Sequence, residues 1–187
     1  MKTFTARIQH SEQTVRLLCK TQYNTFHFRQ KVFQCVAGLA LTVTGLNGAL
    51  GGWGAVVIFL GCWMLVSLNL QAHNLSKQTL EQLGGHFPSA EYRFAEDRFT
   101  FSGENGETDV AYGKLVRLVE DNAYAYLFLG ELVTYMVDKS TVSGGEDEWK
   151  AFLEKKTGLS WTRTNRLLTY SLRSFRKNLA GRRREKK

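Results

Sequence analysis

VFQCVAGLALTVTGLNGALGGWGAVVIFLGCWMLVSLNLQAHNLS, residues 32–76, contains no Asp, Glu, Lys or Arg, although charged residues make up 22% of the chain. A helix needs roughly 20 apolar residues to cross the hydrocarbon core of a bilayer. Residues 32–50 and residues 53–70 each supply such a stretch, and a pair of glycines separates them. The pattern predicts a transmembrane hairpin over residues 32–72, made of two helices and a tight turn.

Two buried core helices of a water-soluble protein are the alternative interpretation of this stretch. Such helices normally carry a polar stripe on one side, whereas the polar residues here are uncharged and scattered. Each predicted span also has two glycines seven residues apart, close to two helical turns, and therefore on one face. Glycine is common in membrane helices, but small residues also let two helices approach closely in lipid. We expect the spans to pack through Gly38, Gly45, Gly54 and Gly61.

The charges that flank the hairpin predict its orientation. Arg29 and Lys31 precede the first span, Lys77 follows the second, and the connecting turn carries no charge. Basic residues are retained on the cytoplasmic side of a membrane. Both chain termini are therefore expected to be cytoplasmic.

The segments on either side of the hairpin read as an α+β domain. Residues 1–31 begin with an alternating strand pattern and continue as an amphipathic helix. Residues 87–158 contain short alternating stretches, an Asn-Gly hairpin turn at Gly106, and an amphipathic helix over 146–156. This order predicts a small antiparallel sheet capped by one helix. The pattern leaves open whether the N-terminal strand joins that sheet.

Three segments of the chain resemble the bacterial YcxB-like family. They are FTARIQHSEQTVRLL near the start, FTFSGENGETDVAYGKLVRLVEDNAYAYLFL in the sheet region, and EDEWKAFLEKK in the last helix. The resemblance covers roughly residues 3–156. It implies an N-terminal strand and helix, two membrane spans, a C-terminal domain similar to pleckstrin-homology (PH-like) folds, and a place in the bacterial inner membrane as a multi-pass protein. It implies no reaction and no functional residues.

The basic character of the chain belongs to its last segment. The net charge is +8, and residues 159–187 hold ten Lys and Arg against Glu185 alone, a charge of +9 that leaves −1 for the rest. As a basic amphipathic helix, this tail would be attracted to anionic lipid or to an acidic partner; a solvated, disordered tail is the alternative. The candidate membrane-surface contacts are Arg163, Arg166, Arg173, Arg176, Lys177, Arg182, Arg183 and Arg184.

No motif in the chain predicts catalysis, metal binding or a cofactor. The four histidines are isolated, and no phosphate-binding glycine loop, nucleophile elbow or dinucleotide fingerprint is present. Cys19, Cys35 and Cys62 lack a CxxC spacing and are expected to be reduced, buried thiols. Nucleic acid is not an expected partner, because the basic tail has no recognition fold beside it.

These observations favour a membrane-anchored interaction module without enzymatic activity. Its sheet domain would bind a protein partner or a lipid headgroup at the cytoplasmic face. The alternative is a subunit of a transporter or channel that forms a homo-oligomer through the glycine faces. An enzyme with an unrecognised site is a third possibility.

Overall fold

The computed structural model describes residues 3–47, 51–104 and 106–164, and the chain divides into two compact units. Among these residues, one unit comprises residues 3–26 and 72–164, and the other comprises residues 27–71. The first unit contains all the strands among the described residues. We call it the strand unit, and the second the hairpin unit.

The first sheet of the strand unit pairs the N-terminal strand with a strand that follows the hairpin unit in the sequence. Its antiparallel order is β1 (Phe4–Gln9), β2 (Ser89–Phe94), β3 (Arg98–Gly103), β4 (Gly106–Ala111). Phe4 pairs with Phe94 and Gln9 pairs with Ser89. The N-terminal strand is therefore part of the sheet, a point that the sequence left open. Phe4, Ala6 and Ile8 are buried while the residues between them are exposed, as the alternation predicts.

The second sheet has the order β7-β6-β5-β8. β5 (Arg117–Glu120), β6 (Tyr124–Phe128) and β7 (Thr134–Asp138) are antiparallel, and β8 (Trp161–Arg163) runs parallel to β5. Two short 3₁₀ turns, η1 (Tyr112–Lys114) and η2 (Lys139–Thr141), connect elements of the unit. The later strands therefore form a sheet of their own, and not part of the one small sheet that the sequence predicts.

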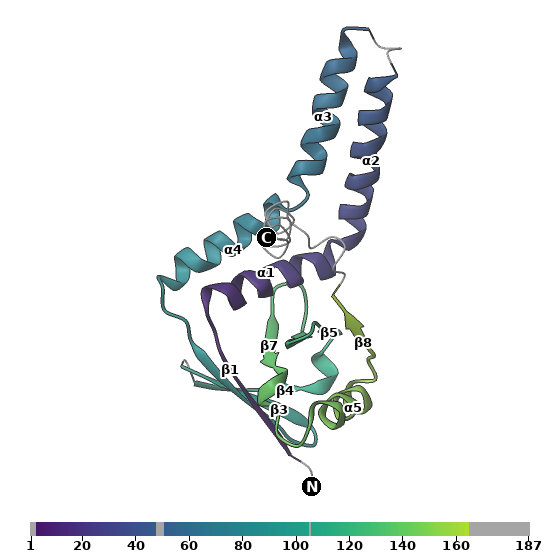
Figure 1. The fold of residues 1–187 in the computed structure, drawn as a ribbon. Coiled ribbons are helices and arrows are strands. Elements are labelled where there is room, and N and C mark those ends of the chain that lie inside the picture. The colour runs from purple at the N-terminus through teal and green to yellow at the C-terminus, as the bar shows by residue number, and fades with distance from the viewer. Residues whose placement is uncertain (1–2, 48–50, 105, 165–187) are drawn as a thin grey trace, which may run out of the picture. The chain divides into compact units, whose positions relative to one another are not determined.

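The helix α5 (Glu146–Thr157) completes the core of the strand unit (Figure 1). Three acids stand in its first turn, where they suit the positive end of a helix, and Gly158 ends it in the left-handed conformation with φ 69°. Trp149 and Leu153 are fully buried, and Trp149 packs edge-on against Phe94 from the first sheet with ring centroids 5.3 Å apart. The core therefore lies between the helix and both sheets.

Two further helices belong to the strand unit: α1 (Glu12–Phe26) and most of α4 (Leu70–Leu83). The Cys19 thiol of α1 lies 3.7 Å from the Thr79 hydroxyl of α4. Burial raises the pKa of Cys19. This cysteine is therefore a neutral thiol, packed between two helices.

The hairpin unit consists of α2 (Phe28–Leu46) and α3 (Trp53–Ser67), which lie side by side (Figure 1). Among the described residues, no single helix is both long and apolar enough to cross a membrane. Only α3 together with α4, which are bent by 41° relative to one another, passes that test as a pair.

The predicted fold of a two-span transmembrane hairpin followed by one helix-capped, PH-like sheet is therefore wrong. The 15 residues of α3 rise about 22 Å, less than the roughly 30 Å of a bilayer core. α2 is longer, but its first turn carries Arg29 and Lys31. The described residues instead form an α+β fold with five helices and two sheets.

Candidate functional site

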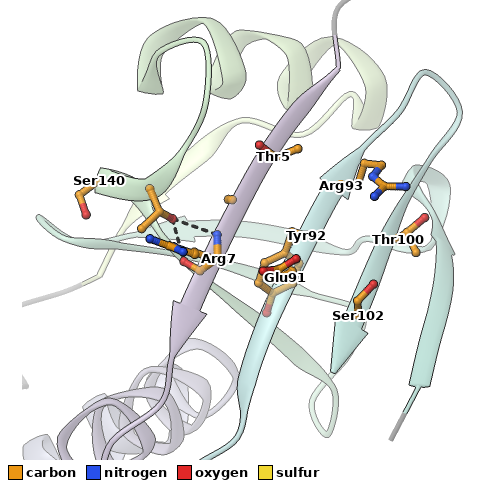
Figure 2. A pocket seen from close by; sticks show the side chains of 10 residues that line it. Thr5, Arg7, Glu91, Tyr92, Arg93, Thr100, Ser102 and Ser140 are labelled. Carbon is orange, nitrogen blue, oxygen red and sulfur yellow. Dashed lines mark hydrogen bonds between the residues drawn. The ribbon is translucent and has the colours of Figure 1, made fainter. Parts of the chain in front are cut away.

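The outer face of the first sheet carries a polar depression, which we call the trough. Side chains of β1, β2 and β3 that alternate with the core residues form its floor, and η2 contributes one wall (Figure 2). Its volume is about 550 Å³. The lining residues are Thr5, Ala6, Arg7, Glu91, Tyr92, Arg93, Thr100, Ser102, Ser140 and Thr141.

Side chains that follow β7 fix the wall of the trough. The Arg7 amide donates to the Thr141 hydroxyl at 3.0 Å, and that hydroxyl lies 2.7 Å from the Arg7 carbonyl oxygen. The Thr5 amide donates to the Ser143 hydroxyl at 2.7 Å. These bonds occupy the outer edge of β1, which would otherwise expose unpaired backbone groups. The wall is therefore anchored to the floor at two places.

The sheet register sets the positions of the charged groups in the trough. Arg7 is paired with Glu91, and Thr5 is paired with Arg93, so the two arginines are diagonal neighbours across β1 and β2. Figure 2 shows Arg7 directed toward Ser140 and Arg93 directed to the side of Thr100. Among the residues that the structure describes, neither of these two guanidinium groups takes part in an ion pair or a side-chain hydrogen bond. The Glu91 carboxylate takes part in none either.

The acids of the neighbouring strand β4 are already engaged. Asp109 accepts hydrogen bonds from Thr100 at 2.7 Å and from Arg98 at 3.3 Å, and the bond from Thr100 is the main reason that the pKa of Asp109 is lowered. Glu107 accepts from Ser102 at 2.8 Å. The trough therefore holds two uncompensated arginines against one carboxylate, beside acids that have their own partners.

A second, smaller cavity of about 380 Å³ contains two of the histidines. His86 Nε2 lies 2.6 Å from a carboxylate oxygen of Glu104, and His10 lines the same cavity. Burial lowers the pKa of His10, which favours its neutral form. In the sequence these histidines look isolated from one another, because no short spacing links them. Within the described ranges, no group of three His, Cys, Asp or Glu residues is placed to hold a metal ion.

The hairpin unit presents a large apolar surface. Large side chains are more than half exposed on both helices, and the principal ones are Phe33 (73%), Val36 (61%), Leu46 (69%), Trp53 (73%), Phe59 (65%), Trp63 (60%) and Val66 (70%). An apolar surface of this extent on a folded chain marks a binding surface for lipid or for another apolar partner.

Several polar side chains of the hairpin unit are hydrogen-bonded within the unit. The Gln34 amide donates to the Met64 carbonyl at 3.0 Å and to the Ser67 hydroxyl at 2.8 Å, across the two helices. Thr42 and Thr44 each donate to the carbonyl four residues earlier. Lys31 donates to the Asn69 side chain at 2.9 Å at the open end of the hairpin. The large exposed side chains between the two ends of the hairpin are apolar.

The structure places the four predicted packing glycines at the contact between α2 and α3. A Cβ atom on Gly45 would lie 2.8 Å from the Gly54 carbonyl oxygen, and one on Gly61 would lie 2.6 Å from that of Gly38. Real Cβ atoms do not come that close to backbone oxygen. The glycine faces of α2 and α3 therefore contact each other within a single chain.

Of the predicted membrane-surface contacts, only Arg163 falls in the described chain, where it is an exposed residue of β8. The other seven, from Arg166 to Arg184, lie outside the described residues. The trough was not predicted from the sequence. The alternation of β1 indicates that Arg7 faces outward, but no local pattern shows that Arg93 lies beside it.

No family model, curated protein or solved structure matches this chain. The resemblance to the YcxB-like family therefore stays a prediction.

Proposed function

We propose that this chain is a membrane-anchored binding module. The hairpin unit inserts its apolar surface into lipid, entering and leaving from one face of the membrane, and the strand unit binds a ligand or partner in the aqueous phase. Arg29, Lys31 and Lys77 flank the inserted segment, which favours the cytoplasmic face.

One observation carries the proposal: the hairpin is apolar on its outside and hydrogen-bonded on its inside. Hydrocarbon offers no partner to a polar group, so polar side chains in lipid must be satisfied by the protein itself. The bonds of Gln34, Thr42 and Thr44 meet that requirement. Burial of each large side chain now exposed contributes roughly 1.5–3 kcal/mol. A helix pair in water would show a polar outer face instead.

The thiol of Cys62, exposed on α3, provides a direct test. In a chain whose other two cysteines are alanine, Cys62 should resist a charged, water-soluble maleimide in open membrane fragments, where both aqueous faces are accessible. It should react after denaturation. The matched control is Thr108→Cys, at an exposed position of β4, in a cysteine-free background; it should react in both conditions. Equal labelling of the two thiols in the membrane fragments would contradict insertion.

A protein partner that covers α3 would also protect Cys62, so a second measurement separates the two cases. A nitroxide attached to Cys62 should collide more often with dissolved oxygen, which concentrates in lipid, than with a water-soluble nickel chelate. A nitroxide packed against protein is shielded from both reagents. Low accessibility to both would show that a protein covers the hairpin and not lipid.

A further inference from the structure

We propose that the trough binds a phosphate group that carries an ammonium group close by, as in phosphoethanolamine. The inference deepens the proposed function, on which it rests for its place at a membrane, by naming the class of ligand. Its starting point is the pair of arginines that the register places diagonally across β1 and β2. Planar guanidinium groups bind phosphate oxygens through two parallel N–H bonds.

The hydroxyl groups in the trough are positioned as acceptors and not as donors. Thr100 donates its proton to Asp109, Ser102 donates to Glu107, and Thr5 donates to Ser143. Each hydroxyl oxygen keeps lone pairs for a ligand. The donors that remain for an anion are therefore the two guanidinium groups. Figure 2 shows them on different sides of the trough, so binding of one phosphate by both requires the exposed side chains of Arg7 and Arg93 to turn toward each other.

Glu91 supplies the complementary negative charge. In the strand register it lies opposite Arg7, and it lies two residues from Arg93 on the same face of β2. A plain phosphate would meet one carboxylate beside two arginines, so part of its attraction would be cancelled. A phosphate that also carries an ammonium group would place a positive charge and several N–H donors near Glu91 and the hydroxyl oxygens. The alternation of charge along the trough favours this zwitterionic ligand.

Titration calorimetry of the full chain in discs of phosphatidylcholine tests the proposal, with phosphoethanolamine, inorganic phosphate and ethanolamine as probes. Phosphoethanolamine should bind more tightly than either fragment. Arg7→Gln and Arg93→Gln should each weaken it roughly tenfold or more, because each removes charge-assisted hydrogen bonds. Glu91→Gln should weaken phosphoethanolamine while leaving inorganic phosphate unchanged or bound more tightly.

The matched control is Arg98→Gln, because Arg98 lies on the same sheet but outside the trough and already pairs with Asp109. Its substitution should leave binding unchanged. The proposal is overturned if phosphoethanolamine does not bind, or if Arg98→Gln weakens binding as much as Arg93→Gln. All four substituted residues are exposed or lie on the outer sheet face, and circular dichroism verifies that each variant folds.

Discs that contain phosphatidylethanolamine distinguish the two sources of this headgroup. Competition with free phosphoethanolamine in these discs assigns the site to the lipid headgroup, and unchanged binding assigns it to a free phosphate ester. The outcome is separable from the labelling of Cys62. If the hairpin proves to lie in water while phosphoethanolamine still binds, the trough stands and only its lipid source is lost.

Discussion

Replacement of Glu120 by Gln tests the charged cluster that Glu120 of β5 forms with Lys139 of η2 and Lys150 of α5. The Glu120 side chain is 9% exposed, and its two oxygens accept hydrogen bonds from Lys150 at 2.8 Å and from Lys139 at 3.1 Å. Lys139 is 8% exposed and also pairs with Glu146 at 2.7 Å. In the Glu120→Gln variant, the buried Lys139 ammonium group and the partly exposed Lys150 ammonium group would face a neutral amide that has one acceptor oxygen.

The expected loss of unfolding free energy is about 3 kcal/mol. Removing one partner of a buried ion pair typically costs about 3–5 kcal/mol. The lower end applies because Lys139 keeps Glu146, and Lys150, at 22% side-chain exposure, can turn toward water. A loss of this size lowers Tm by about 10 °C in a unit of this length.

Thermal unfolding of the full chain, followed by near-ultraviolet circular dichroism of the buried Trp149 and Tyr126, measures this loss. The matched control is Glu146→Gln, because Glu146 pairs with the same lysine but is 40% exposed; it should cost about 1 kcal/mol or less. If both variants shift Tm equally, the buried position of Glu120 does not carry the energy and the reasoning fails.

The same cluster predicts a pH dependence. Burial acts to raise the pKa of Glu120, but the hydrogen bonds and charges of Lys150 and Lys139 outweigh it, so the pKa lies below its ordinary value. A carboxylate with a lowered folded-state pKa stabilises the fold above its unfolded pKa, about 4.3, and that contribution disappears as the pH falls through the folded value. The difference in Tm between wild type and Glu120→Gln should therefore shrink below about pH 4.

Three further substitutions follow from the packing. Gly61→Ala should loosen α2 from α3 by roughly 1–3 kcal/mol, measured as faster hydrogen exchange in α3, whereas Gly52→Ala, with open space around it, should not. Trp149→Phe should cost less than about 1.5 kcal/mol in urea unfolding, because its buried Nε1–H has no hydrogen-bond partner among the described residues; a loss above about 3 kcal/mol would contradict this. Gly158→Ala should destabilise the strand unit by about 1 kcal/mol in the same assay, since φ is 69° there.

Local pattern predicts the elements of this fold better than their partners. The alternation in residues 3–9 and the turn at Gly106 follow from chemistry over a few residues, and both are present in the structure. That β1 pairs with β2, and that the later strands form a second sheet, depends on contacts between distant residues that no local window contains.

The prediction of two membrane spans is wrong because the uncharged stretch is longer than the individual helices that it forms. The uncharged stretch is interrupted at the glycine turn and again between Ser67 and Leu70, where the helix direction changes by 41°. No residue at the second break is a proline or a glycine, so the local composition does not predict the break. The trough was missed for a related reason: Arg7 and Arg93 become neighbours only once the sheet has formed.

The pairing of Phe4 with Phe94 makes the hairpin unit an insertion inside the first sheet. During synthesis, β1 leaves the ribosome long before β2 exists, so its edge has no native partner until everything between them has been made. The helices of the hairpin unit therefore form while the first sheet still lacks β2. Assembly of the strand unit is then the last event, and a chain whose strand unit is incomplete would expose an unpaired strand edge with which other chains can pair.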